Sequence, residues 1–432
     1  MSTANPSQRN RLSQLAGVEE THRLRNPRSE RALRNLARWL PGGDTRTTTW
    51  YEPFPLVIEH ATGALMFDLD GHQMIDFIGN YTALVHGHGP PAVTAAIQAA
   101  LIRGTVFAAP LLEQGELAAR LVGRIPSIEL IRFTNSGTEA NLIAVRIARA
   151  ATGRQRVAVA AHSYHGSYEA LDWRSTGPNT VVFPANDIDG TVEALGDGRD
   201  LAAVIIEPVL GSGGVIPVMQ EYLSFLRDFT HDSGSLFIFD EVMTMRLAYG
   251  GLQEALSVKP DLTTLGKVIG GGLPIGAVGG AANIMELTDP RRSSAISHSG
   301  TFNGNRLAMV AGAAALDLLD REAIGRINFL GEKLANGIIV AATSRGLGLS
   351  VTSYGSLLNL HSLPDVHTPA EAQIAAAQPM KRLLHLKLLE RGIFMAPRGE
   401  LCTSTAMDET TIDMAVEAIG LAFDELSDAS EY

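Results

Sequence analysis

The sequence contains LFIFDEV at residues 236–242, DLTTLGK at 261–267 and three glycines at 270–272. Leu236–Phe239 is an uninterrupted apolar run, which is typical of a strand buried on both faces of a sheet. The run ends on two carboxylates, Asp240 and Glu241. Lys267 lies between a short apolar turn and the glycines, which let the backbone approach a ligand closely. These features indicate a buried strand near a polar, glycine-rich site.

Lys267 and Asp240 form a chemically meaningful pair. A lysine in a sheltered pocket can lose its proton and become a nucleophile toward a carbonyl carbon. Pyridoxal 5′-phosphate (PLP) requires such a lysine, as well as an acidic partner for its ring nitrogen. The pair therefore indicates a PLP site. The alternative is that Lys267 is a surface lysine in a glycine-rich loop and that Asp240 caps a helix.

Length and composition restrict the class of protein. A chain of 432 residues predicts two domains, or one large domain with a smaller lobe. The net charge of −11 argues against a nucleic-acid partner, which would favour a basic face. Cys402 is the only cysteine, so we expect no disulfide framework and no cysteine-based zinc site. The predicted location is the cytoplasm, and the site residues include no metal ligands.

The N-terminal segment, Met1–Arg34, is polar and lacks an apolar core, so it does not have the pattern of a secretory signal. A transit peptide for an organelle remains an alternative for this arginine- and serine-rich start. No run approaches the ~20 apolar residues of a membrane span, and we expect no membrane partner.

Short apolar strands alternate with helical patterns in the middle of the chain. The predicted strands are Leu130–Phe133, Val157–Ala161, Thr180–Phe183, Ala202–Ile206 and Leu236–Phe239. Helices are predicted between most of them, as at Ala140–Ala151 and Glu221–Thr230. This order predicts an α/β fold with a mostly parallel sheet covered by helices, and a ligand site at the carboxyl ends of the strands.

The two ends of the chain predict a smaller α/β lobe. At the start we expect a loose arm, a helix near Ser29–Leu40, an extended segment at Thr45–Tyr51 and a hairpin within Leu56–Asp76. From about Arg306 we expect the chain to be helical to Arg345. Strands near Leu349–Thr352 and Leu357–His361 and helices at Pro369–Glu390 and Asp408–Leu426 should follow. The predicted organisation is an N-terminal segment at 1–75, a large PLP-binding domain at 76–310 and a C-terminal small domain at 311–432.

Most of the remaining candidates follow a predicted strand. Ser136, Gly137 and Thr138 lie between a strand and a helix, where backbone N–H groups and hydroxyls can bind a phosphate. An ordinary helix cap by Ser136 or Thr138 explains the same pattern equally well. The other candidates for the cofactor site are Tyr164, Glu207, Val242, Met243 and Thr301. The alternatives are core packing for Tyr164 and a structural salt bridge for Glu207.

Three motifs together carry a family resemblance. FTNSGTEAN at 133–141, FDEVMT at 239–244 and LGK at 265–267 resemble the class III PLP-dependent aminotransferases of fold type I. The resemblance covers about Arg34 to Ala422 and lies in the branch that includes glutamate-1-semialdehyde aminomutase. Within that branch the sequence is similar to the β-amino-acid (β-phenylalanine-type) aminotransferases.

The resemblance implies a role for each candidate. Lys267 matches the Schiff-base lysine and Asp240 the partner of the ring nitrogen. Ser136, Gly137 and Thr138 match the phosphate cup, and Tyr164 matches the aromatic residue that stacks on the ring. Thr301 matches a hydroxyl that reaches the phosphate in the neighbouring subunit, which implies a homodimer with shared active sites. Met243 departs from the family, because many members carry a glutamine there that contacts the phenolic oxygen of the cofactor.

The expected substrates are a small amino donor and a keto acid. Arg46 and Arg398 are candidates for binding a substrate carboxylate, since a guanidinium binds carboxylates through two hydrogen bonds. Surface arginines are the alternative for both. Tyr81 is placed with them as a substrate residue. The predicted activity is transamination from an amino acid, in particular a β-amino acid, to pyruvate or 2-oxoglutarate. An intramolecular aminomutase and a non-catalytic PLP-binding domain are the alternatives.

Overall fold

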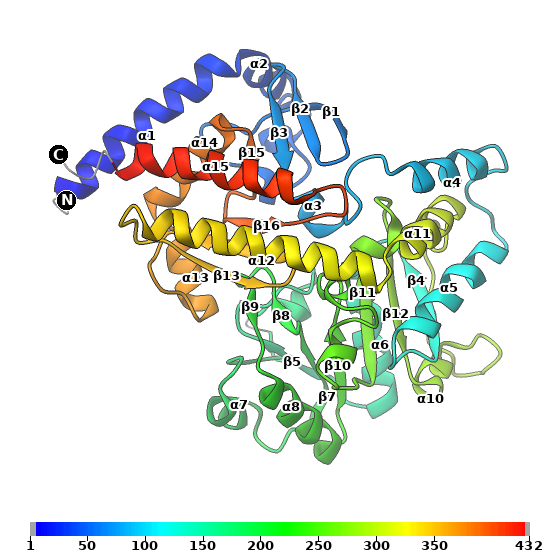
Figure 1. Ribbon diagram of the computed structural model, residues 1–432. Helices are drawn as coiled ribbons and strands as arrows, with labels where there is room; N and C mark the ends of the chain where they lie inside the picture. The colour runs from blue at the N-terminus through cyan, green and yellow to red at the C-terminus, as the bar shows by residue number, and fades with distance from the viewer. Residues whose placement is uncertain (1–5, 176, 428–432) are drawn as a thin grey trace. The chain divides into compact units, whose positions relative to one another are not determined.

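The computed structural model describes residues 6–175 and 177–427. Contacts divide the chain into two compact units. Unit 1 comprises residues 1–81, 86–89 and 327–432, and unit 2 comprises residues 82–85 and 90–326. The first five residues of the predicted N-terminal arm lie outside the described residues. Figure 1 shows the elements of both units along the chain.

Unit 2 is built on a seven-stranded sheet in the order β4-β12-β11-β10-β7-β5-β6. The strands are β4 (Leu130–Thr134), β5 (Arg156–Ala160), β6 (Thr180–Phe183), β7 (Leu201–Ile206), β10 (Leu236–Asp240), β11 (Leu262–Gly266) and β12 (Gly276–Gly280). β12 is antiparallel to both of its neighbours, and the pairs from β11 to β6 are parallel. The predicted mostly parallel α/β sheet is therefore confirmed.

β11 and β12 were not among the predicted strands. The interpretation of Leu262–Gly266 as a short turn is wrong, because these residues pair with β10 on one side and β12 on the other. Glycines make β12 resemble a loop in sequence. The sheet nevertheless requires them, since a Cβ at Gly276 would overlap the Ser136 carbonyl oxygen and one at Gly280 would overlap the Asp261 carbonyl oxygen.

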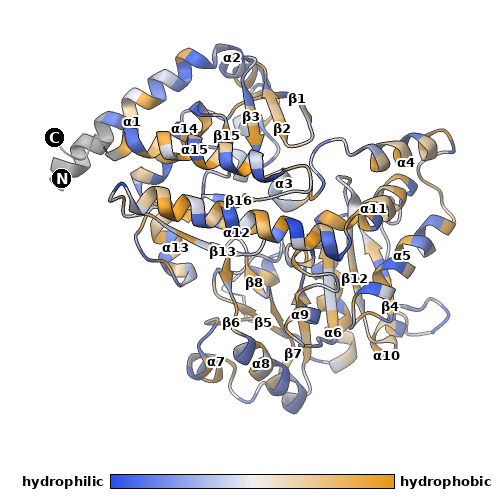
Figure 2. Ribbon diagram, in the orientation of Figure 1, coloured by the Kyte–Doolittle hydropathy of each residue, from blue (hydrophilic) through white to orange (hydrophobic). Residues whose placement is uncertain are grey.

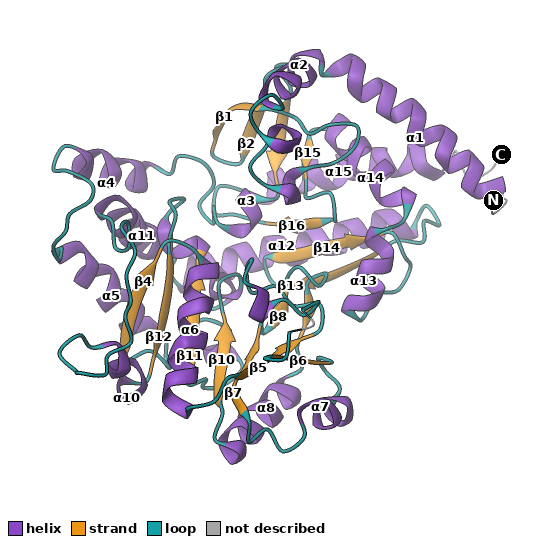
Figure 3. Cartoon of the chain, turned by 180° about the vertical axis from the view of Figure 1, so that it is seen from behind, coloured by secondary structure: helices purple, strands orange, loops and turns teal. Residues whose placement is uncertain are grey.

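Helices pack around this sheet (Figure 3). The helices of unit 2 are α4 (Pro91–Leu101), α5 (Leu112–Arg124), α6 (Gly137–Thr152), α7 (Ile188–Leu195), α8 (Gln220–Ser233), α9 (Leu252–Ala255), α10 (Ala282–Met285) and α11 (Arg306–Leu318). A two-stranded ribbon joins β8 (Val209–Leu210) and β9 (Ile216–Pro217). α6 packs across β4, β7, β10, β11 and β12, and its buried side chains belong to the core of the unit. The start of α6 is consequently fixed relative to several strand ends.

Unit 1 contains two smaller sheets. One joins β1 (Ile58–Thr62), β2 (Leu65–Asp68), β3 (Gln73–Asp76) and β15 (Ile393–Phe394), and the other joins β13 (Ser350–Tyr354), β14 (Leu357–His361) and β16 (Glu400–Cys402). The helices are α1 (Pro6–Arg25), α2 (Pro27–Leu36), α13 (Pro369–Ala376), α14 (Pro379–Glu390), α15 (Glu409–Ser427) and the part of α12 (Arg321–Thr343) that follows Arg326. Figure 2 shows apolar and polar colours alternating along α12 and α15, as expected for helices with one buried face.

Several predicted elements of unit 1 are corrected. The loose arm is wrong for the described residues from Pro6 onward, since they form α1. The single helix at 369–390 is two helices, because Pro379 begins α14 and cannot continue α13. Thr47–Thr49 forms a 3-10 turn within the segment predicted to be extended. The predicted helical stretch at 306–345 is confirmed, and it consists of two helices, α11 and α12, that are separated between Leu318 and Arg321. No helix among residues 6–175 and 177–427 is long and apolar enough to cross a membrane.

Candidate active site

The candidates of unit 2 meet at one edge of the seven-stranded sheet. Asp240 is the last residue of β10 and pairs with Thr264 on β11, which ends two residues later at Gly266. Gly266 pairs with Gly276 on β12, and Gly276 pairs with Thr134 at the end of β4. Lys267 directly follows Gly266, and Ser136 lies two residues after Thr134. Carboxyl ends of parallel strands are the usual place for a ligand in such sheets.

Three N–H groups donate to the Asp240 carboxylate, which is only 2% exposed. Asn141 Nδ2 lies 2.7 Å and His165 Nδ1 2.8 Å from Oδ2, and the Val242 backbone nitrogen lies 3.0 Å from Oδ1. The Asn141 side chain is itself fixed, because its Oδ1 accepts from Thr264 Oγ1 at 2.6 Å. This buried network holds the carboxylate in one orientation at the strand end.

Asn141 and His165 had no predicted role, although Asn141 ends the FTNSGTEAN motif and His165 directly follows the candidate Tyr164. Asn141 is a buried polar residue on a largely apolar face of α6, and that exception is a sequence signal for a functional contact. His165 Nε2 is buried and has no hydrogen-bond partner among the described residues. Its neighbour in the site is Glu207, whose electrostatic interaction with His165 lowers the pKa of Glu207.

Glu207 joins two loops of the site. Its Oε1 accepts from the Tyr164 backbone N–H at 2.8 Å, and its Oε2 accepts from the Gly211 N–H at 3.2 Å. Burial raises the pKa of this carboxyl to about 7, Asp240 adds to the increase and His165 opposes it. Glu207 therefore fixes the loop that carries Tyr164 and is poised to change its charge near neutral pH.

The start of α6 has the form of an anion site. Ser136 is the N-cap residue, and its Oγ accepts from the Glu139 N–H at 3.1 Å. The first N–H groups of a helix have no partner within the helix and favour a negative charge. A Cβ at Gly137 would lie 2.9 Å from both methyl groups of Val242, and one at Gly166 would overlap Thr138 Oγ1. The Ser136 side chain can therefore cap α6 while backbone N–H groups at the start of the same helix bind a phosphate.

Lys267 leaves the sheet beside this cup. A Cβ at the preceding Gly266 would lie 3.2 Å from Val242 Cγ1 and 3.6 Å from the Gly137 Cα, so the three backbones converge. Lys267 itself has a φ of 51°, which is unfavourable for a residue with a side chain. Strained backbone of this kind is concentrated at active sites. The geometry therefore gives a residue-level reason to regard Lys267 as functional.

The remaining cofactor candidates surround the same edge. Met243 packs on Gly211, where a Cβ would overlap its sulfur. Tyr164 is 53% exposed. The loop that carries Thr301 is attached to the cup, because Asn135 Nδ2 lies 2.7 Å from Asn303 Oδ1. Thr301 itself is exposed.

The three substrate candidates lie together in unit 1. Arg46 Nη1 donates to Asn80 Oδ1 at 2.8 Å, and its guanidinium carbon lies 6.0 Å from the centre of the Tyr81 ring. Burial raises the pKa of the Tyr81 phenol, Glu400 adds to the increase, and Arg398 and Arg46 oppose it. Both arginines thus act electrostatically on one tyrosine.

Tyr81 occupies a strained turn. Asn80 and Tyr81 have φ values of 50° and 55°, and the Tyr81 hydroxyl donates to the Thr48 carbonyl at 2.6 Å. The turn and Arg46 border a cavity of about 330 Å³ within unit 1. Apolar side chains such as Ile58, Ile78 and Phe394 line most of the rest of this cavity.

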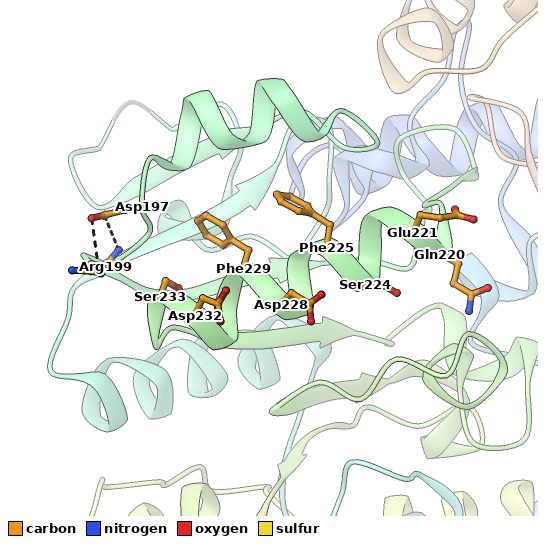
Figure 4. A pocket seen from close by; sticks show the side chains of 10 residues that line it. All are labelled: Asp197, Arg199, Gln220, Glu221, Ser224, Phe225, Asp228, Phe229, Asp232 and Ser233. Carbon is orange, nitrogen blue, oxygen red and sulfur yellow. Dashed lines mark hydrogen bonds and ion pairs between the residues drawn. The ribbon is translucent and has the colours of Figure 1, made fainter.

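A larger hollow, of about 960 Å³, lies elsewhere on unit 2 and contains no candidate residue (Figure 4). Phe225 and Phe229 on α8 line it, together with Asp197 and Arg199. Its lining follows α8 from Gln220 to Ser233 and includes none of the candidate residues, so its size does not make it the site.

The residues at the strand ends fit PLP. The buried Asp240 carboxylate suits a ring N–H, and the start of α6 suits a phosphate. At four positions a glycine lets the chain lie closer to its neighbours than a residue with a Cβ could. These glycines are Gly137, Gly166, Gly211 and Gly266. Within residues 6–175 and 177–427, no group of three histidine, cysteine or acidic side chains is arranged to bind a metal ion.

The family model for class-III aminotransferases matches residues 47–171 and 184–410. The chain belongs to this family. The predicted family is thereby confirmed, and with it an enzyme of the transaminase class whose cofactor is PLP. The alternative of a non-catalytic domain is set aside.

Relatives of this class-III aminotransferase fall in both predicted branches. The chain is 40% identical over 402 residues to the β-phenylalanine transaminase of Variovorax paradoxus. This match covers 91% of the chain and 92% of the relative. The chain is 39% identical over 363 residues to a glutamate-1-semialdehyde 2,1-aminomutase of Rhodopirellula baltica, which covers 78% and 82%.

Solved structures agree with this placement. The β-phenylalanine aminotransferase from Variovorax paradoxus superimposes with a TM-score of 0.91 at 38% identity, over 95% of this chain and 97% of that chain. A transaminase with PLP bound gives a TM-score of 0.88 at 36% identity, over 94% and 99%. The fold type predicted from the motifs is thus confirmed over nearly the whole chain.

Proposed function

We propose that this class-III aminotransferase transfers the amino group of a β-amino acid to a keto acid such as pyruvate or 2-oxoglutarate. The observation that carries the proposal is the convergence of Gly137, Val242 and Gly266, which brings Lys267 beside the α6 cup at the sheet edge where Asp240 ends β10. Similarity to a β-phenylalanine transaminase supports the choice of donor.

Each residue at the sheet edge has a separate task. When bound, PLP supplies an aldehyde for the substrate nitrogen and an electron-withdrawing ring. Asp240 would hold the ring nitrogen in its protonated form, and the Ser136–Thr138 segment would bind the phosphate. Tyr164 and Val242 would contact the ring. Lys267 Nζ would take the proton from the amine-bearing carbon of the donor and act as the general base and acid.

Two further residues tune the site. Glu207 holds the Tyr164 loop through a backbone hydrogen bond. Met243 stands where many family members have glutamine, and a thioether cannot donate a hydrogen bond to the phenolic oxygen of the cofactor. The enzyme therefore tunes the electronics of its cofactor without that contact.

The active form that we propose is a homodimer with shared sites. Exposed apolar side chains of unit 2 support an interface; they are Leu101, Ile102, Phe107, Leu112 and Phe302. Arg306 connects their segments, because its guanidinium carbon lies 4.8 Å from the Phe107 ring centre and its backbone N–H donates to Thr105. Thr301 adjoins Phe302, so an interface at this surface would bring its hydroxyl to the phosphate of the neighbouring subunit.

Arg46 and Arg398 divide the recognition of carboxylates in this proposal. The carboxylate of a β-amino acid lies one carbon further from the amine than that of an α-amino acid, so one fixed arginine suits only one of the two. The contacts of both arginines near Tyr81, and the largely apolar cavity bordered by Arg46, support an apolar donor that carries a carboxylate.

Substitution of the two arginines tests the proposal. Arg46→Ala and Arg398→Ala should each raise KM for a carboxylate substrate. The expected loss of binding free energy is roughly 1.5–3 kcal/mol, which is typical of a charge-assisted contact. One variant should affect β-phenylalanine more and the other the keto acid. Steady-state kinetics with 1-phenylethylamine provide the control, because this amine has no carboxylate. Equal losses on both amines would show that the arginines are structural.

The aminomutase remains the second candidate because of the relative from Rhodopirellula baltica. Incubation with a semialdehyde amino acid in the absence of any keto acid distinguishes the two activities. A transaminase requires the second substrate for turnover, whereas an intramolecular aminomutase does not. Product formation over many turnovers without a keto acid would replace the proposed activity by the second one.

A further inference from the structure

A buried lysine lies in the core of unit 1. Lys381 on α14 is 2% exposed, and its Nζ donates to the Leu360 carbonyl oxygen on β14. An ammonium group without compensating contacts is costly to bury. The proposed transamination assigns no role to this residue, and its surroundings therefore require an explanation.

The turn that carries Arg398 lies directly on this ammonium. A Cβ at Gly399 would overlap both Lys381 Nζ and the Leu360 carbonyl oxygen, and it would lie 2.8 Å from Asn359 Oδ1. The φ of Gly399 is 96°, which only glycine adopts without strain. The turn is closed by a hydrogen bond of 2.8 Å from the Gly399 N–H to the Ala396 carbonyl. Lys381 thus touches the backbone next to Arg398.

Glu400 connects the two cationic side chains. Its Oε1 accepts from Arg398 Nη2 at 2.9 Å. Burial lowers the pKa of the Lys381 amine to about 7, and the charge of Glu400 opposes that fall. Glu400 Oε2 and Asn359 Oδ1 are buried without a hydrogen-bond partner among the described residues. Lys381 therefore acts on Glu400 through its charge and not through a hydrogen bond.

A second titratable group on α14 does not change this balance. His385 lies one turn further along α14, and burial lowers its pKa to about 3, with smaller contributions from His22 and Lys381. His385 is therefore neutral at the pH of most assays. The Arg398–Glu400 pair and, below about pH 7, the Lys381 ammonium thus supply the charge at this turn.

We propose that Lys381 is a positioning residue for substrate recognition: its ammonium shares the charge of Glu400 and fixes the 396–400 turn, which leaves the Arg398 guanidinium available to a substrate carboxylate. Without Lys381, the whole charge of Glu400 acts on Arg398 and competes with the substrate. The inference rests on the proposed role of Arg398 in binding a carboxylate.

Kinetics of the purified holoenzyme below about pH 7, where the Lys381 amine is protonated, test this inference. Lys381→Met should raise KM for β-phenylalanine about tenfold, and kcat and KM for 1-phenylethylamine should change by less than about twofold. Lys387→Met is the matched control on the same helix, because Lys387 is also largely buried but pairs with Glu390 and Glu425. Equal effects of Lys381→Met on the two amines would overturn the inference.

A second variant keeps the test decisive if Lys381→Met fails to fold. Glu400→Gln removes the competing charge, so it should leave KM for β-phenylalanine unchanged or lower it. A KM raised as much as in Arg398→Ala would overturn the inference. Where both single variants fold, the double variant should behave like Glu400→Gln, and additive effects would contradict the mechanism.

Arg398→Ala separates this inference from the proposed function. If Arg398→Ala raises KM for β-phenylalanine while Lys381→Met does not, only the role of Lys381 is wrong. If Arg398→Ala leaves KM for every carboxylate substrate unchanged, the proposed recognition of carboxylates is wrong as well.

Discussion

Lys267 is the residue at which the local backbone and the proposed chemistry agree most closely. Its left-handed φ of 51° is unfavourable for lysine, yet the chain adopts it immediately after β11. The conformation directs the chain out of the sheet beside Gly137 and Val242. A surface lysine in a flexible loop would not need this strain.

Lys267→Ala should abolish transamination, with a loss of about 10²-fold to 10⁴-fold or more, because the proton-transferring amine is absent. The variant should still bind PLP, since Asp240 and the α6 cup remain. Borohydride reduction followed by mass spectrometry should fix the cofactor to the wild type and not to the variant. Lys259→Ala, at an exposed position, is the control. Near wild-type turnover of Lys267→Ala would contradict the assigned role.

Glu207 should give the cofactor-free protein a distinctive pH dependence. Its pKa in the folded state, about 7, exceeds the ordinary value of 4.5, so the folded state retains a proton that the unfolded state releases. The resulting stability is fully present below about pH 4.5 and is lost as the pH rises through about 7, with a magnitude on the order of 3 kcal/mol at most.

Glu207→Gln should remove this pH dependence, because an amide does not titrate. We expect the Tm of the wild type to fall, relative to that of the variant, between pH 5 and pH 8. Glu193→Gln is the control, because Glu193 is exposed on α7. A variant with the same pH dependence of Tm as the wild type would show that Glu207 is not the group responsible.

At the scale of elements, the site depends on how closely its loops approach α6. Gly166 has a φ of 93°, and a Cβ there would overlap Thr138 in the first turn of α6. Gly153, the C-cap residue of α6, has a φ of 73° but nothing within 4 Å of a Cβ. Both glycines therefore have a backbone conformation that strains other residues, but only Gly166 lacks room for a Cβ.

Gly166→Ala should weaken PLP binding about tenfold or more, because the overlap displaces the Thr138 segment in addition to about 1–3 kcal/mol of backbone strain. Gly153→Ala should lower Tm through strain alone and leave PLP affinity unchanged. Titration of both cofactor-free variants with PLP gives the comparison. Equal affinities of the two variants would show that the close approach does not shape the phosphate cup.

At the scale of the whole molecule, the candidate residues are distributed between two units with separate cores. The cofactor candidates belong to unit 2, and the substrate candidates Arg46, Tyr81 and Arg398 belong to unit 1. The exposed apolar surface near Phe302 belongs to unit 2, as does Thr301. Burial of this surface against a second copy is the basis of the proposed dimer.

Ile102→Asp should convert the proposed dimer to a monomer, because Ile102 is 88% exposed and a carboxylate is costly to bury in an interface. Activity should fall with the dimer, since Thr301 would no longer reach a neighbouring site. Light scattering and activity can be measured on the same samples. Val192→Asp, at another exposed apolar position, is the control. A fully active monomer would contradict shared active sites.

The sequence by itself determined the fold class, the family and the position of Asp240, because each rests on local patterns. Apolar runs specify buried strands, and the motifs around Ser136, Asp240 and Lys267 are short and contiguous. β11 and β12 were not predicted, because glycine-rich segments have no strand-like pattern. Only pairing with neighbouring strands makes these segments strands.

Only the tertiary structure decided what the neighbouring carboxylates Asp240 and Glu241 do. Asp240 faces Asn141 and His165, whereas Glu241 turns away and accepts from the backbone of Leu252 and Gln253. Alternation along a strand sends adjacent side chains to opposite faces, but the sequence does not say which face holds the site. The buried Lys381 beneath the Arg398 turn is decided in the same way, by contacts between residues far apart in the chain.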